Sequence, residues 1–149
     1  MLVSQNRAAS FNFILLEKLE AGMVLLGTEV KSLREGKANL REAYAVIRAG
    51  AVWLLNCHIG EYLPGGPFNH SPLRPRKLLL RKSEIEKLDR KTENKGLTIV
   101  PLKIYFREGI AKCEIALAQG KKKWDRRQSE KDKETKREVG DAMRQFSRR

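Results

Sequence analysis

Short runs of β-branched, aromatic and leucine residues alternate with glycine-containing turns over most of the first 119 residues. This pattern is typical of antiparallel strands joined by hairpins. The clearest hairpins are predicted for residues 44–48 with 52–57 and for residues 97–106 with 110–118. Pro101 lies inside the third of these runs and predicts a bulge or a sheet edge there, because proline cannot donate a backbone hydrogen bond.

Two more strands are predicted near the start of the chain, over residues 11–19 and 22–26, with a corner at Glu20-Ala21 between them. Together with the hairpins, they give about five or six strands, a number typical of small barrels. The sequence therefore predicts a mainly β fold: a small antiparallel barrel, closed or partly open, with flanking short helices. An OB-like barrel is one candidate for this architecture.

The helices are predicted to be few and short. Thr28 is expected to cap a helix over residues 29–33. Residues 39–42 begin with an asparagine and end with a glutamate three residues on, which predicts a single turn of helix. Residues 83–86 have the spacing of a capping box, with a serine as the N-cap and a glutamate three residues on. This pattern predicts a third helix that Gly96 ends.

The balance of charge divides the chain near Gly120. Of 31 Lys and Arg residues and 18 Asp and Glu residues, residues 120–149 hold 12 and 6, with few large apolar groups. So little apolar surface cannot offset the entropy lost on folding, so we predict a folded domain over residues 1–119 and a basic tail over residues 120–149. The tail is expected to be disordered when free and helical when docked, with Met143 in a thin apolar stripe. The net charge of +13 indicates a polyanionic partner.

Several classes of function find no support in the residues. No apolar run approaches the roughly 20 residues of a membrane helix, and no charged leader precedes an apolar segment at the start. Cys57 and Cys113 lie far apart in apolar segments and are expected to be buried, reduced thiols of a cytosolic protein. Neither paired metal ligands nor a glycine-rich phosphate loop is present. We therefore predict a cytoplasmic protein that is not an enzyme and uses no cofactor or metal.

Two clusters of basic residues indicate nucleic-acid binding. Residues 73–82 contain five cations and no acid around an apolar triplet, which favours a track for phosphates. A strand with solvated charges would explain the same run without RNA. In residues 120–127, Trp124 lies among lysines and arginines, where it either stacks on a base or folds back onto the barrel.

Several stretches, which follow one another along the chain in the same order as in the family, together resemble small protein B (SmpB), the partner of transfer-messenger RNA (tmRNA) in bacterial ribosome rescue. The matching stretches are residues 20–22, 27–34, 36–40, 76–80 and 120–122. The resemblance extends from Asn6-Arg7 to about Arg127, with a looser match beyond. The chain departs from the family at residues 8–11, which read AASF where basic residues and a histidine are usual.

The resemblance implies an OB-type barrel that binds the elbow of the tRNA-like domain of tmRNA. It also implies that the protein takes the place of an anticodon arm in the decoding centre, with its tail helical in the empty mRNA channel. The implied function is that of an adaptor in trans-translation, which delivers tmRNA to the A site of stalled ribosomes for peptide tagging and rescue. The implied partners are alanyl-charged tmRNA, the ribosome and elongation factor Tu; the chain is expected to be a monomer when free, with no membrane partner.

The candidate site residues form two groups. Those expected to bind RNA on the barrel are Asn6, Arg7, Glu20, Lys31, Asn39, His70, Arg74, Arg76, Lys77 and Leu80. Those expected to bind the ribosome through the tail are Lys121, Lys122, Trp124, Asp125, Arg126, Arg127 and Met143. Glu20 is the one carboxylate of the first group, and it can accept a hydrogen bond from a base or a 2′-hydroxyl where a cation cannot. Without the resemblance, the alternatives are a general cytosolic OB-type RNA-binding protein or RNA chaperone and, more remotely, a cationic membrane-surface protein.

Overall fold

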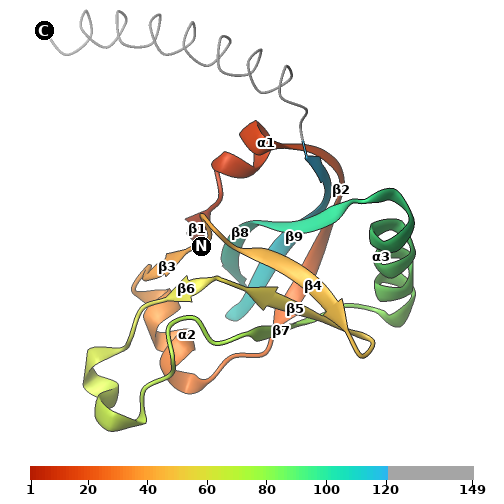
Figure 1. The fold of residues 1–149 in the computed structure, drawn as a ribbon. Coiled ribbons are helices and arrows are strands. Elements are labelled where there is room, and N and C mark those ends of the chain that lie inside the picture. The colour runs from red at the N-terminus through yellow and green to blue at the C-terminus, as the bar shows by residue number, and fades with distance from the viewer. Residues whose placement is uncertain (121–149) are drawn as a thin grey trace, which may run out of the picture.

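The structure is a computed structural model that describes residues 1–120, apart from the side chains of Asn94 and Lys95. Within this range, six antiparallel strands form a closed barrel in the order β8-β4-β5-β7-β2-β9, and β9 pairs again with β8 (Figure 1). The barrel strands are β2 (Phe13–Met23), β4 (Tyr44–Arg48), β5 (Ala51–Leu55), β7 (Arg76–Leu79), β8 (Thr98–Arg107) and β9 (Ile110–Gly120). The prediction of a mainly β, antiparallel barrel with short flanking helices is confirmed.

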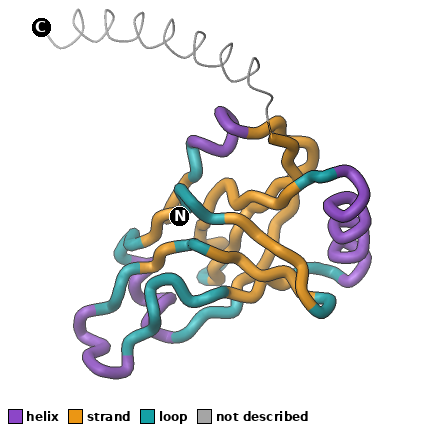
Figure 2. The backbone as a smooth tube through the Cα atoms, in the orientation of Figure 1, coloured by secondary structure: helices purple, strands orange, loops and turns teal. Residues whose placement is uncertain are grey.

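The other described strands and the helices surround the barrel (Figure 2). The strand β1 (Leu2–Gln5) pairs with β8, and β3 (Ala38–Asn39) pairs with β6 (His58–Ile59). The helical segments are α1 (Ala8–Asn12), α2 (Gly27–Arg34), the 3-10 segment η1 (Leu63–Phe68) and α3 (Lys82–Lys95). Helix α3 lies against the side of the barrel, where Lys87 and Lys91 form ion pairs of 2.9 and 3.2 Å with Glu17 of β2.

Both predicted hairpins are present, and each turns on two residues. Ala49 and Gly50 have φ angles of 51° and 74°, and Glu108 and Gly109 have φ angles of 53° and 78°. Left-handed conformations at both positions produce the turn whose twist matches that of the flanking strands. The predicted bulge is also confirmed, because the register between β8 and β9 shifts directly after Pro101.

The predicted corner at Glu20-Ala21 is wrong, because β2 is one continuous strand. Both residues pair with β9, opposite Glu114 and Cys113, and the hydrogen-bonded ladder continues on either side of them. The strand starts later than predicted, since residues 8–12 form α1. The 11-residue strand that results reaches along most of the barrel and brings distant parts of the sequence together.

Helix α2 starts earlier than its predicted cap. Its N-cap is Leu26, whose backbone N–H donates to Glu29 Oε1 at 2.8 Å. Thr28 therefore lies inside the first turn, and the prediction that it caps the helix is wrong. Its hydroxyl instead lies 2.9 Å from a ring nitrogen of His70. The glutamate has taken over the capping function because its carboxylate reaches back to the N-cap amide.

Helix α3 also starts before the expected residue. The backbone N–H of Arg81 donates to the Glu84 carboxylate at 2.9 Å, so Arg81 is the N-cap and Ser83 lies in the first turn. The predicted end is confirmed, since Gly96 caps the helix with a left-handed φ of 63°. The helical turn expected over residues 39–42 is wrong: β3 ends there, and a turn leads toward β4.

The barrel interior is filled by aliphatic side chains that alternate along the strands. The largest fully buried apolar side chains are Leu33, Leu40, Leu54, Ile59, Leu78, Leu88, Ile99, Ile104, Ile115 and Leu117. They come from the barrel strands, from α2, α3 and β6, and from the connection between β3 and β4. Burial of this apolar area is the main force that holds the strands in a closed ring.

Both cysteines are buried free thiols, as predicted. Burial raises the pKa of the Cys57 thiol to about 11 and also raises the pKa of Cys113. For Cys57 this lowers the thiolate population near neutral pH by about a hundredfold. We therefore expect the folded protein to react at least about a hundredfold more slowly with a thiol reagent than the protein in denaturant. Rapid labelling of either cysteine at pH 7.5 without denaturant would contradict this burial.

Candidate nucleic-acid interface

A buried ion pair lies beneath the predicted phosphate track. The side chains of Glu29 and Arg76 are both 0% exposed, and Arg76 Nε lies 2.5 Å from Glu29 Oε2. Arg74 Nη2 lies 2.5 Å from the other carboxylate oxygen, Glu29 Oε1, and the side chain of Arg74 is 31% exposed. Glu29 lies in the first turn of α2 and Arg76 starts β7, so the pair joins the helix to the barrel. Burial raises the pKa of Glu29, but hydrogen bonds from Arg74, the Leu26 amide and Arg76 outweigh it and leave the pKa lowered.

The guanidinium of Arg76 makes all its contacts within the protein. Besides Glu29, it donates to the backbone carbonyls of Cys57, Pro72 and Ser71 at 2.5, 3.0 and 3.3 Å. A phosphate cannot reach a fully buried group whose donors point at carbonyls. The predicted direct contact between Arg76 and RNA is therefore wrong for this structure. Arg76 therefore holds residues 71–72 and Cys57, the residue directly before β6, in place.

His70 belongs to the same scaffold. Its ring is 4% exposed and lies between Thr28 Oγ1, at 2.9 Å from Nδ1, and the carbonyl of Ile59, at 2.9 Å from Nε2. A carbonyl only accepts, so Nε2 carries the hydrogen and donates it. Both nitrogens are occupied, which replaces the predicted RNA contact of His70 with a bridge between α2, β6 and the loop before β7.

The remaining barrel candidates lie at or near the surface. Arg7, Lys31, Asn39 and Lys77 are exposed, and Lys77 alternates with the buried residues of β7. The Lys31 ammonium lies 5.5 Å from the ring centroid of Tyr62. The four cations among the candidates at the surface, including the partly exposed Arg74, come from separate parts of the chain and are available to phosphates.

Two predicted residues at the RNA face are anchored to the barrel. The amide of Asn6 donates to the carbonyl of Pro101 at 3.0 Å, which ties the start of the chain to the bulge in β8. Leu80 is half-buried and packs on the core. Each of these two residues therefore helps to fix the shape of the barrel surface on which RNA is expected to lie.

Glu20 lies on the outer surface of the barrel and already has partners. The Tyr105 hydroxyl donates to Oε2, and Arg107 Nη1 lies 3.3 Å from each carboxylate oxygen. The hydrogen bond from Tyr105 and the charge of Arg107 lower the pKa of Glu20. Burial and the hydrogen bond to Glu20 raise the pKa of Tyr105 to about 12. Glu20 is thus a carboxylate and Tyr105 a hydrogen-bond donor at neutral pH.

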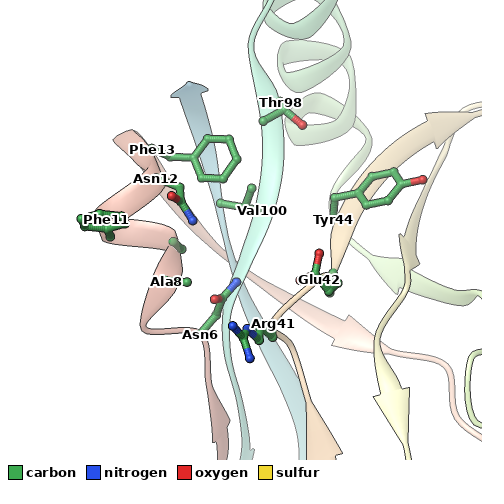
Figure 3. A pocket seen from close by; sticks show the side chains of 12 residues that line it. Asn6, Ala8, Phe11, Asn12, Phe13, Arg41, Glu42, Tyr44, Thr98 and Val100 are labelled. Atoms are coloured by element: carbon green, nitrogen blue, oxygen red, sulfur yellow. The ribbon is translucent and has the colours of Figure 1, made fainter. Parts of the chain in front are cut away.

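A surface cavity of about 600 Å³ opens between α1, the start of β4 and the start of β8. Figure 3 shows Phe13 and Tyr44 on either side of it, with Arg41 and Asn6 together at one end. Rings that flank a hollow and a cation at its rim suit a flat nucleobase with its phosphate. Sequence reasoning included Asn6 but missed this cavity, since its walls come from residues up to 94 positions apart.

Sequence reasoning also missed Glu29, although it had a usable signal for Arg76. Arg76 and Leu78 are two residues apart in a strand and therefore share a face. The leucine must face the core, so the arginine faces inward too and requires a buried carboxylate. The tail candidates, from Lys121 to Met143, lie outside the described residues.

Within the described residues, no group of three or more His, Cys, Asp or Glu side chains could hold a metal ion. No helix there has the length and apolar character needed to span a membrane.

The fold and the surface define a class, that of small basic β-barrel proteins with exposed cations and aromatic rings. The family model for SmpB protein matches residues 3–145, and the chain belongs to this family. The resemblance that the sequence motifs carry is therefore confirmed.

Relatives match over nearly the full length. The chain is 53% identical over 146 residues to the SsrA-binding protein of Trichodesmium erythraeum, covering 97% of this chain and 94% of that protein. It is 50% identical over 147 residues to the SsrA-binding protein of Geobacter sulfurreducens, covering 99% and 96%. A solved chain described under "tmRNA-SmpB: a journey to the center of the bacterial ribosome" superimposes with a TM-score of 0.69 at 48% identity, covering 83% of this chain and 87% of that one.

Proposed function

We propose that this chain is an RNA-binding adaptor of trans-translation. It binds the tRNA-like domain of tmRNA and delivers it to the A site of stalled ribosomes, which leads to peptide tagging and ribosome rescue. The single observation that carries the proposal is family membership over almost the whole chain, with relatives named for SsrA RNA. The closed barrel supplies a rigid body for the exposed cations that such an RNA needs.

The proposal includes where the chain works and with what. Its partners are alanyl-charged tmRNA, elongation factor Tu and the ribosome, at the decoding centre of the small subunit and the mRNA channel. The chain acts by binding, not by catalysis, in the cytoplasm, and is a monomer before it meets RNA. Residues 1–119 hold the RNA, and residues 120–149 contact the ribosome.

The proposal is tested by sequencing the RNA that co-purifies with the tagged chain from its own cells. Enrichment of tmRNA over other structured RNA supports it. In a titration at fixed salt, the chain should prefer the tRNA-like domain to an unstructured RNA of equal length. Equal affinity for both would instead support a general RNA-binding protein or RNA chaperone.

Lys77→Ala is expected to weaken RNA binding and to lower the salt slope by about one, the loss of one phosphate contact. Lys77 is exposed and no ion pair forms around it in the described residues, so the fold should remain. The measurement is RNA affinity at several salt concentrations. Glu61→Ala, a change at an exposed site of opposite charge, is the control and should not lower the slope. An unchanged slope for Lys77→Ala would remove this residue from the interface.

A further inference from the structure

The outer face of β2, β9 and β8 carries a cluster of charged and aromatic side chains. Cross-strand partners in an antiparallel sheet share a face, so the register defines two neighbouring rows. One row is Glu20, Glu114 and Lys103, and the next contains Lys112 and Tyr105. Arg107 lies two residues beyond Tyr105 on the same face of β8. We call Glu20, Lys103, Tyr105, Arg107, Lys112 and Glu114 the Tyr105 cluster.

Tyr105 is held at two points within this cluster. Its hydroxyl donates to Glu20, and the Lys103 ammonium lies 5.6 Å from the centroid of its ring. A ring fixed in this way loses little conformational freedom when a second flat group stacks on it. The ring is partly exposed, so its surface is accessible.

The cations of the cluster face solvent, whereas its carboxylates are paired. The side chain of Arg107 is 66% exposed, and that of Lys103 is 41% exposed. Glu20 binds Tyr105 and Arg107, and Glu114 lies 4.0 Å from Lys103. The carboxylates therefore repel an approaching phosphate less than free ones would, while the cations keep unused donors.

We propose that Tyr105 stacks on an unstacked nucleobase of the bound RNA, that Lys103 and Arg107 hold its neighbouring phosphates, and that Glu20 positions Tyr105 and Arg107 without touching the RNA. The identity of the RNA rests on the proposed function. Loops and elbows of folded RNA display such bases, and proteins read them by aromatic stacking beside cations. Glu20 thus changes from a direct acceptor of RNA hydroxyls to a positioning residue.

A double-mutant cycle separates the two roles of Glu20. Affinity of the full chain for a transcript of the tRNA-like domain is measured at fixed salt. Tyr105→Leu is expected to weaken binding about tenfold, the usual effect of losing one stacked base. Glu20→Ala should weaken wild-type binding by a similar factor. In a Tyr105→Leu/Arg107→Ala background, Glu20→Ala should change affinity by less than about twofold, since the groups that it positions are absent.

Each other outcome overturns a part of the proposal. A full Glu20→Ala effect in that background means that Glu20 touches the RNA itself. Wild-type affinity of Tyr105→Leu means that the ring does not stack. Tyr105→Phe differs by one hydroxyl, keeps the fold if the larger change does not, and should give a smaller loss in the same direction. An unaltered affinity of Tyr105→Phe would show that the Glu20 anchor does not act on RNA.

The control is Arg90→Ala, which removes one exposed cation from α3 and should leave affinity within about twofold. A loss as large as that of Arg107→Ala would show that net charge alone explains the effect of Arg107 and would overturn its contact with a phosphate. Tyr105→Leu leaves the net charge unchanged, so its loss reports the ring itself. Binding of unstructured RNA as tightly as the transcript contradicts the proposed function instead. The cycle then still reports whether Glu20 acts through Tyr105 on the RNA that binds.

Discussion

Glu29→Gln is expected to lower the free energy of unfolding by about 3–5 kcal/mol, the typical cost of removing one partner of a buried ion pair. Glu29 and Arg76 are both 0% exposed and lie 2.5 Å apart. The variant keeps the shape of the side chain and one oxygen but leaves the guanidinium of Arg76 buried without a counter-charge. Chemical denaturation monitored by circular dichroism measures the change.

The reason for so large an effect is that water cannot reach the orphaned charge. An exposed pair loses little when one partner is removed, because solvent replaces it. Glu35→Gln is the matched control, since Glu35 lies 3.7 Å from Lys37 with a side chain that is 46% exposed. We expect it to change the free energy of unfolding by less than about 0.5 kcal/mol.

A second variant tests the cause. Adding Arg76→Met to Glu29→Gln removes the buried cation as well and should recover part of the lost stability. Equal losses for Glu29→Gln and Glu35→Gln would show that the buried pair does not support the barrel. A double variant less stable than Glu29→Gln alone would assign the contribution of Arg76 to its bonds with the carbonyls of residues 57, 71 and 72.

The lowered pKa of Glu29 gives the same pair a pH dependence. A carboxyl whose pKa is lower in the folded state contributes its full stability above the ordinary value of 4.5. That contribution is lost as the pH falls from there through the folded pKa. The wild-type protein should therefore lose more stability than Glu29→Gln on acidification below this value.

Local rules were sufficient for the hairpins and insufficient for the site. The turn at Ala49-Gly50 and the bulge at Pro101 follow from the conformational limits of the residues themselves. Helix starts were less certain, because a glutamate in the first turn of α2 or α3 can cap the amide of a leucine or an arginine as well as that of a serine.

Residues far apart in sequence decide the roles of the charged side chains. Arg76 reaches a carboxylate 47 positions away, and His70 reaches a hydroxyl 42 positions away. The basic cluster marked Arg76 as a candidate RNA contact, because an arginine looks the same in a sequence whether it is buried or exposed, and nothing near His70 in the sequence showed that its ring is buried. Only the spacing of Arg76 two residues before Leu78, which places both side chains on one face of β7, indicated an inward side chain. The same limit hid the partners of Glu20, which lie 85 and 87 positions further along.

A chain that ends at Gly120 is expected to fold and to bind the tRNA-like domain, yet to support no peptide tagging on stalled ribosomes. The last strand of the described barrel, β9, ends at Gly120, and the last buried core residue within residues 1–120 is Ala118. The ring is therefore complete without residues 121–149. We expect the free energy of unfolding to change by less than about 0.5 kcal/mol, since no described core contact is removed.

RNA affinity should fall only as far as the lost charge requires. Residues 120–149 supply 12 cations and 6 acids, so part of the salt-dependent, sequence-independent attraction is removed with them. The preference for the tRNA-like domain over unstructured RNA should persist, because the surfaces of the barrel remain. Tagging is measured in a reconstituted reaction with ribosomes stalled at the end of a truncated message.

The boundary itself is tested by a shorter chain that ends at Gly109. This cut removes β9, which pairs with β2 on one side and with β8 on the other. The barrel then opens, because β2 and β8 each lose one partner strand, and the buried residues between Ala111 and Ala118 are absent. We therefore expect no cooperative unfolding transition. If the chain ending at Gly120 also lacks that transition, the folded domain needs residues beyond the barrel. If it folds and still supports tagging at the wild-type rate, the contacts that commit the ribosome to rescue lie on the barrel and not in residues 121–149.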